Sequence, residues 1–358
     1  MKILAIDIGA GTKDILLYDS EKKNIENCIK MVLPSPTQTF ATKIKQVTTE
    51  GKDIFVNGDT IGGGALTSAL KAHIEKGLRV VVTESAAYTI RNVLEEVKQL
   101  GIEVVTEDNE TQEFRGETIT LEEINLNQLQ LFLEGFGETF TDIDVVAIAV
   151  QDHGVFPAGV SNRKFRIQKM RELLKEKPKP ENLAFREEEI PPCFLRMKSA
   201  AQASRRQLPN AKVLLMDTSP DALLGCLKDP IAEKANPVLV VNAGNGHTMA
   251  SIISNGEIVG MLEHHTRLLS PQKIERLLVD FANGDLSDDD VFKDNGHGLF
   301  YLSNPLGFSR IEKVVATGPN RNILSQTKFP VYFAAPGGDV MMTGPVGLIE
   351  AAKNKFDL

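Results

Sequence analysis

Two glycine-containing segments, far apart in the chain, share one pattern of residue types. This repeat constrains the fold more than any other feature. Residues 3–12 (ILAIDIGAGT) align without a gap with residues 238–247 (VLVVNAGNGH). Each copy has an apolar run, one polar residue, a Gly-x-Gly step and a second polar residue, and a further apolar run follows. The pattern predicts a strand, a tight turn and a returning strand, and two copies predict a duplicated α/β architecture.

The chemistry of these turns favours phosphate. Glycine lets the backbone approach a ligand closely, and successive turn amides can form a nest for an anion. The chain lacks a P-loop motif, and Gly9-x-Gly11 leads into a strand without a third glycine, so the dinucleotide fingerprint is absent. Two hairpins without a ligand remain the alternative. The predicted phosphate-binding residues are Gly9, Gly11, Thr12, Asn242, Gly244, Asn245, Gly246, His247 and Thr248.

Between the two copies, strand-like and helix-like runs alternate, which is typical of an α/β layer. Apolar runs predict strands at 54–57, 80–83, 102–105 and 145–151, and helices at 64–76, 86–100 and 126–140. Residues 161–210 differ, because a highly charged helix at 163–177 is followed by Pro178-Lys179-Pro180. We expect this segment to be a solvated surface insertion, with a partner-binding arm as the alternative.

Length and charge limit the classes of function. A chain of 358 residues suits two domains. A net charge of −8 and the absence of tryptophan argue against dedicated binding of nucleic acid or of an anionic membrane. No apolar run approaches membrane-spanning length, and Asp7 interrupts the first one, so the sequence predicts a cytoplasmic protein without a signal peptide.

Five short motifs, in order along nearly the whole chain, resemble those of the superfamily that contains actin, the heat-shock chaperones and the sugar kinases. Residues 6–14 resemble its first phosphate motif and residues 241–248 its second. Residues 212–225 resemble the strand and connecting helix between them. Residues 314–320 resemble the adenosine motif, and residues 337–347 the start of the closing helix.

The resemblance implies an α/β fold with duplicated ribonuclease-H-like (actin-like ATPase) domains around an interdomain cleft. The first domain would cover 1–235, with an inserted segment at about 161–210, and the second 236–338. The closing helix, 339–358, would return to the first domain. ATP and Mg²⁺ are the implied cofactors, for phosphoryl transfer to a small molecule or for ATP hydrolysis. The implied adenosine-binding residues are Gly318, Pro319, Asn320, Gly337 and Gly338.

Two positions depart from the superfamily pattern. Asn242 stands where the second phosphate motif usually has aspartate, and a neutral amide binds a hard cation weakly. Asp7 is therefore the predicted metal anchor and the first predicted catalytic residue. Pro319 follows Gly318 where two glycines are common, which changes the contact expected for adenine.

Phosphoryl transfer also requires a residue that orients or deprotonates the nucleophile. Gln151-Asp152-His153-Gly154 ends a buried apolar run and resembles the Gly-Gln-Met-His-Gly stretch of sugar kinases. This implies Asp152 as a base, with Gln151 and His153 as substrate contacts; turn residues that cap the next segment are the alternative. Asp217 stands where the chaperones place a water-positioning carboxylate.

Gly62 and Gly63 precede a predicted helix, whose N-terminus can hold an anion. They are candidate substrate-binding residues, and a flexible connector is the alternative. More narrowly, the chain resembles an uncharacterised prokaryotic family sometimes labelled pyruvate formate-lyase activating enzyme. That label implies a Cys-x-x-x-Cys-x-x-Cys cluster site, which Cys28, Cys193 and Cys226 do not supply.

Three functions remain open at this point. The first is a kinase or ATPase with a small-molecule substrate. The second is an ATPase switch, an activase or a non-catalytic nucleotide-binding protein that acts on a protein partner. The third is a metal-dependent hydrolase built from histidines. Five of the six histidines lie in turn-like contexts: His153, His247, His264, His265 and His297.

Overall fold

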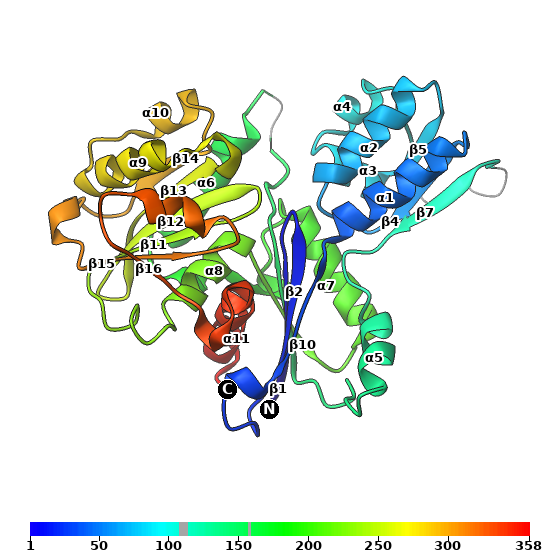
Figure 1. Ribbon diagram of the computed structural model, residues 1–358. Helices are drawn as coiled ribbons and strands as arrows, with labels where there is room; N and C mark the ends of the chain where they lie inside the picture. Colours follow the sequence, from blue (N-terminus) through cyan, green and yellow to red (C-terminus); the bar gives the residue numbers. More distant parts are fainter. Residues whose placement is uncertain (107–113, 157–158) are drawn as a thin grey trace.

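Each glycine hairpin opens a six-stranded sheet of its own in the computed structural model, which describes residues 1–106, 114–156 and 159–358 (Figure 1). The first sheet has the order β3-β2-β1-β8-β10-β9. Its strands are β1 (Lys2–Ile8), β2 (Thr12–Asp19), β3 (Ile29–Pro34), β8 (Val145–Val150), β9 (Ala184–Arg186) and β10 (Lys212–Met216).

The second sheet has the order β14-β13-β12-β11-β15-β16. Its strands are β11 (Val238–Ala243), β12 (His247–Ser254), β13 (Glu257–His265), β14 (Gly298–Tyr301), β15 (Lys313–Thr317) and β16 (Val331–Phe333). In both sheets the first hairpin strand pairs antiparallel with the second and parallel with a later strand. This shared order confirms the duplicated ribonuclease-H-like fold.

The central strands are apolar because both of their faces are covered. All six residues of β8 are buried, and so are the first four of β11. Helix α9 (Pro271–Asn283) covers the second sheet through Ile274, Leu278 and Phe281. The short helix α10 (Asp288–Lys293) follows and leads into β14. Asp7 and Asn242 are each the second-last residue of the first hairpin strand. Each is partly exposed and lies next to the glycine turn.

A four-stranded parallel sheet between β3 and β8 was not foreseen as a separate unit. Its order is β6-β5-β4-β7, and it has its own apolar core (Figure 1, upper right). The hydrophobic periodicity of the sequence indicates single strands and helices. It does not indicate that these four strands pair with each other in a separate sheet. The elements are α1 (Pro36–Thr49), β4 (Ile54–Gly58), α2 (Gly64–Glu75), β5 (Val80–Thr83), α3 (Glu84–Ile90), α4 (Leu94–Lys98), β6 (Glu103–Val105) and β7 (Glu117–Leu121).

The expected solvated insertion at 161–210 is wrong. Helix α6 (Asn162–Leu174) buries Arg166 and Ile167, β9 closes an edge of the first sheet, and α7 (Leu195–Gln207) buries Met197. The segment is rich in charge, but part of that charge is neutralised inside the protein, which composition alone does not reveal. Helix α5 (Leu126–Glu134) precedes this segment and lies beside α7 in Figure 1. Unlike α6 and α7, it leaves large apolar side chains exposed.

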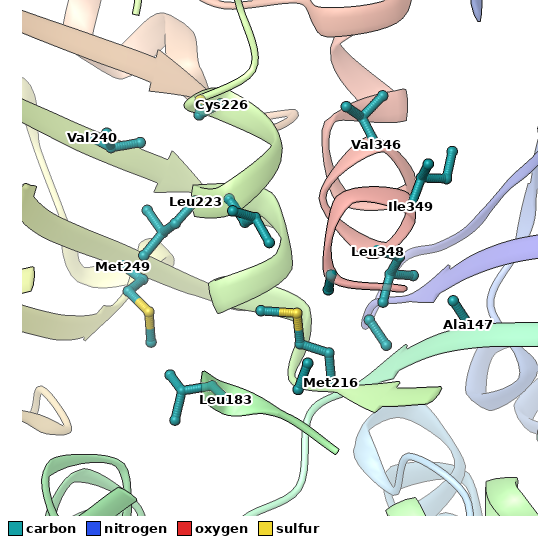
Figure 2. Close-up of a cluster of buried hydrophobic side chains, with 14 of the residues drawn as sticks. Ala147, Leu183, Met216, Leu223, Cys226, Val240, Met249, Val346, Leu348 and Ile349 are labelled. Carbon is teal, nitrogen blue, oxygen red and sulfur yellow. The ribbon is translucent and has the colours of Figure 1, made fainter. Parts of the chain in front are cut away.

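Two helices connect the halves and pack tightly on each other: α8 (Thr218–Cys226) and α11 (Thr343–Phe356). A methyl group on Gly225 would lie 1.8 Å from Thr343 O, and one on Gly347 would lie 1.9 Å from Asp221 O. Only glycine permits this backbone approach. Figure 2 shows Leu223 and Cys226 of α8 and Val346 and Ile349 of α11 in the apolar layer between the two sheets. The closing helix therefore returns to the junction.

Among the described residues, no helix combines the length and the apolar composition needed to cross a bilayer.

Candidate functional site

A cavity of about 390 Å³ lies where the two hairpin turns meet the inserted sheet. Its wall includes Gly9 of the first turn, Gly244 of the second, Gln151 after β8, Thr218 of α8 and Gly344 of α11. Its volume is in the range of about 300–1,000 Å³ that small-molecule sites occupy. The fold thus collects distant sequence motifs around one space.

The two turns have the same local geometry and face each other. Gly9 N donates to Thr12 O at 3.0 Å, and Gly244 N donates to His247 O at 2.9 Å. A methyl group on Gly11 would lie 2.5 Å from Asn245 Nδ2, so the tips almost touch. The predicted phosphate-binding residues that line the cavity are Gly9, Thr12, Asn242, Gly244, Asn245, Gly246 and His247.

Thr248 does not line the cavity. Its hydroxyl is buried and lies 3.0 Å from Thr266 Oγ1, and Thr266 donates to Gly244 O at 2.8 Å. Thr248 therefore supports the second turn from behind. Because side chains alternate along a strand, the residue after His247 points to the opposite face.

Asp7 faces a buried group of carboxylates. It is directly opposite Asp14 in the β1–β2 register, and Asp221 of α8 lies beside it. A methyl group on Gly344 would lie 2.3 Å from Asp7 Oδ2 and 2.9 Å from Asp221 Oδ2, so both carboxylates converge on the start of α11. Burial, reinforced by Asp14 and Asp217, raises the pKa of Asp7 well above its ordinary value.

The neighbouring carboxylates share this effect. Burial raises the pKa of Asp14 to about 7, although a hydrogen bond from Thr12 opposes the shift. Burial, with repulsion from Asp7, raises the pKa of Asp221 well above its ordinary value. Like charges this close strongly disfavour joint ionisation unless a cation joins them.

Asp152 and Asp217, the other two predicted catalytic residues, have engaged carboxylates. Asp152 accepts hydrogen bonds from Gly154 N at 2.8 Å and Met197 N at 3.1 Å. Both oxygens of Asp217 accept from Arg166, at 2.6 and 2.8 Å. Asp152 thus orders a turn and Asp217 belongs to an ion pair, so this arrangement favours neither the base role nor the water-positioning role.

The predicted adenosine residues occupy four different settings. Pro319 lines the cavity. Asn320 holds the second turn, because its N donates to Ala243 O at 2.9 Å and its Nδ2 donates to Gly244 O at 3.0 Å. Gly318, at φ +93°, packs against Asn242. Gly337 and Gly338 lie against residues 25–26 and outside the cavity wall, so the structure does not bring them to the other three.

All four predicted substrate residues line the cavity: Gln151, His153, Gly62 and Gly63. Arg196 joins this end, donating from Nη2 to Glu123 Oε1 at 2.8 Å and from Nη1 to Gln151 O at 2.9 Å. Its guanidinium packs directly on Gly62. Arg196 is held by a fully buried carboxylate and placed between the first sheet and the inserted sheet.

The histidines meet at the second hairpin. One ring nitrogen from each of His153, His247 and His297 lies within 4.8 Å of the others, and His265 flanks them. His264 points elsewhere, with Nε2 at 3.1 Å from Asp294 Oδ2. The cluster draws on both halves of the molecule, because His153 follows β8 and the other two belong to the second half.

Besides Arg196 and Glu123, sequence reasoning missed four residues of this site. Asp14 could have been found from the hairpin itself, since it follows the first turn and faces Asp7 across the strands. Asp221 could have been found one helical turn after Asp217. Arg166 and Glu263, paired at 2.9 Å, left no local signal because they lie 97 positions apart.

The two sheets, their connecting helices and the facing glycine hairpins define a protein with the actin-like ATPase fold. The chain belongs to the family described as "Putative pyruvate format-lyase activating enzyme (DUF1786)", whose model matches residues 61–323. No curated protein matches the chain.

Several solved structures are similar to the whole chain. A Listeria monocytogenes protein described as "a putative N-acetylmannosamine kinase" shares 11% identity over 99% of this chain and 100% of its own, with a TM-score of 0.37. The ROK hexokinase from Thermus thermophilus shares 11% over 99% and 100%, with a TM-score of 0.32. A Ppx/GppA protein from Aquifex aeolicus shares 11% over 89% and 66%, with a TM-score of 0.31.

The cysteines do not form the cluster site that the family description would require. All three are free; Cys28 and Cys226 belong to the apolar layer between the sheets, whereas Cys193 packs on the other core of the first half. Burial raises the pKa of Cys226, which lies inside α8. These positions favour structural thiols.

Proposed function

We propose that the protein binds ATP in the cavity between its two hairpins and transfers the terminal phosphoryl group to a small molecule. One observation carries the proposal: the repeated glycine turns face each other across a cavity whose wall includes Asp7 and Asp14, each with one buried carboxylate oxygen that accepts no hydrogen bond from the described residues. Turn amides from both sides suit the polyphosphate, and Thr12 and His247 add polar side chains. Hinge movement at α8 and α11 would close the site, as in many phosphoryl-transfer enzymes.

The carboxylates fit a hard cation. Among the described residues, Asp7 Oδ1, Asp14 Oδ1 and Asp221 Oδ2 are buried without a hydrogen-bond partner. Mg²⁺ prefers such oxygen ligands, keeps several waters, and uses one or two carboxylates together with substrate phosphates. Asp7 and Asp14, which both line the cavity, would hold it, with Asp221 beside Asp7. When bound, the ion neutralises charge on the transferring phosphate.

The other end of the cavity supports a small-molecule acceptor. Thr60 and the glycines that precede α2 line it together with Asn92 and Gln151. Arg196 supplies a fixed cation there, because Glu123 holds it from behind at 2.8 and 2.9 Å. A small molecule with hydroxyl groups and negative charge would match these donors.

A partner-directed ATPase is the second candidate. Exposed apolar side chains on α5 and in the turn that follows it favour this candidate. Leu131 and Phe136 are 71% and 72% exposed, and Phe132 is 56% exposed. Exposed apolar groups of this kind mark interaction surfaces in many soluble proteins. This candidate requires only the activation of water and a surface that responds to the nucleotide.

ADP release, measured with Mg²⁺ and a panel of hydroxylated small molecules, separates these candidates. A kinase releases ADP only when its small-molecule acceptor is added. An ATPase switch releases ADP without any added small molecule. In either case Asp7→Asn should lower the rate by about 100-fold or more, the scale of losing one preorganised electrostatic group. Asp357→Asn, at the exposed end of the chain, is the matched control. The proposal fails if neither ATP nor ADP raises the Tm with Mg²⁺ present.

A further inference from the structure

We propose that His153, His247 and His297 bind one divalent transition-metal ion beside the second phosphate hairpin. This site is separate from the carboxylates around Asp7 and does not depend on nucleotide binding. One ring nitrogen from each residue lies within 4.8 Å of the others, so small ring movements would bring the three nitrogens to the ~3.3 Å separation of tetrahedral ligands around one ion. Their ring centroids are 4.6 to 6.2 Å apart.

The three imidazoles are fixed by different parts of the fold. His153 lies in the turn after β8, a turn that the Asp152 carboxylate holds. His247 begins β12, where Gly244 N donates to its carbonyl oxygen at 2.9 Å. His297 precedes β14, and its N donates to Glu263 O at 2.9 Å. Because two sheets supply the ligands, the site forms only when both halves are assembled.

A carboxylate stands behind the cluster, as it does behind many metal-bound histidines. His297 Nδ1 lies 3.2 Å from Glu263 Oε2, within ion-pair distance but not aligned as a hydrogen bond, and the carboxylate would accept this N–H if Nε2 bound the ion. Arg166 donates from Nε to Glu263 Oε2 at 2.9 Å and also binds Asp217. Two carboxylates and one guanidinium leave a net negative charge beneath the imidazoles, which favours a cation there.

The donor set of three imidazole nitrogens selects the kind of ion. Neutral imidazole suits zinc, iron, nickel and copper, whereas magnesium prefers oxygen. His265, with its ring 4.8 Å from that of His297, flanks the cluster.

The site has the donor set of a catalytic rather than a structural zinc centre. Structural sites use four protein ligands, whereas catalytic sites use three and leave a fourth position for water or substrate. His153 and His247 line the same cavity as Gly9 and Asn242, so the open position would face the expected phosphates. The proposed ligand class at that position is an oxygen of water or of a phosphate.

Metal analysis and cobalt spectroscopy test the site. Purified full-length protein, stripped with a chelator and reloaded with Zn²⁺, should bind one equivalent that dialysis does not remove. Co²⁺ should produce visible absorption bands in the wild type. Loss of a group that only hydrogen-bonds to a metal ligand weakens metal binding by ~10–100-fold. We expect a larger loss of Zn²⁺ affinity in each of the variants His153→Ala, His247→Ala and His297→Ala. Glu263→Gln should fall within that smaller range.

His73→Gln is the matched control. His73 is also buried, but it lies in the inserted sheet unit, with Nδ1 at 2.8 Å from Thr48 Oγ1. The proposal is overturned if the wild type binds less than one equivalent, or if the cluster variants, folded by circular dichroism, retain the affinity of His73→Gln. Should a cluster variant fail to fold, the wild-type cobalt spectrum decides, because unchanged bands on Zn²⁺ addition would contradict the site.

Discussion

The two hairpins have nearly the same backbone but opposite chemistry. In the first, Asp7 and Asp14 face each other across the strands; in the second, the matching positions are Asn242 and Met249. The second hairpin instead carries His247, opposite His265 in the register of β12 and β13. A duplicated scaffold therefore keeps the turn geometry, which glycine specifies, and changes the ligands beside it. One copy suits a hard cation and the other a softer one.

The largest expected effect is on the pH dependence of stability in chelator. Burial raises the pKa of Asp14 in the folded protein to about 7, above its ordinary value of 3.8, so its contribution to stability is complete below pH 3.8 and is lost as pH rises towards 7. Asp14→Asn should therefore gain about 4 kcal/mol over wild type between pH 4 and 8. Urea unfolding at each pH measures this difference.

His247→Gln should show the reverse trend. Burial lowers the pKa of His247 in the folded protein to about 3, below its ordinary value of 6.5, so wild type loses stability as pH falls through this window. The variant should gain on wild type as pH falls from 6.5 towards 3. Parallel pH profiles for the two variants would contradict the assignment of opposite chemistry.

The second effect is a separation of functions between the hairpins. Asp7→Asn should lower the rate of Mg²⁺-dependent turnover by about 100-fold or more. The same variant should still bind Zn²⁺ with the wild-type stoichiometry. His247→Ala should lose Zn²⁺ and keep the Mg²⁺ binding measured without nucleotide, because the carboxylates around Asp7 are unchanged. Calorimetric metal titrations of both variants test the pair. If either substitution removed both metals, the hairpins would form one site.

A smaller effect is expected when the second hairpin is made more like the first. Asn242→Asp adds a carboxylate to the cavity wall, where it should strengthen Mg²⁺ binding about tenfold through added Coulomb attraction. Mg²⁺ titration by thermal shift measures the change. An unaltered affinity would show that Asn242 lies too far from the ion to contribute.

The smallest effect concerns the turn tips, which are not equally crowded. A methyl group on Gly11 would lie 2.5 Å from Asn245 Nδ2, whereas one on Gly246 would lie 3.7 Å from Ala10 Cβ. Gly11→Ala should destabilise by about 1 kcal/mol, because Asn245 must move. Gly246→Ala should stay within about 0.5 kcal/mol. Chemical unfolding compares the two, and equal effects would contradict the asymmetry.

The hairpins were readable from the sequence because their information is local. An apolar run, a glycine turn and a returning apolar run specify strand, turn and strand without help from the remainder of the chain. The same locality allowed Asp7 to be identified as the candidate metal anchor, and its unpartnered oxygen supports that choice. Gln151 and His153, predicted as substrate contacts, line the cavity.

Asp152, predicted as a base, and Asp217, predicted as a water-positioning carboxylate, show the limit of local reasoning. Asp152 and Asp217 follow strands as predicted, yet backbone amides and Arg166 occupy their oxygens. The partner of Asp217 comes from 161–210, the segment expected to be solvated. A motif thus places a carboxylate near a site, but its neighbours decide whether the carboxylate is free to act.

The sequence alone determined the duplicated halves, their glycine turns and the loss of aspartate at Asn242, because each depends on neighbours along the chain. Only the tertiary structure decided which side chains meet. It brought Asp7 to Asp221 across the α8–α11 junction, and His153 to His247 and His297 across two sheets. Such contacts depend on how whole elements pack, and one-dimensional spacing carries no information about that packing.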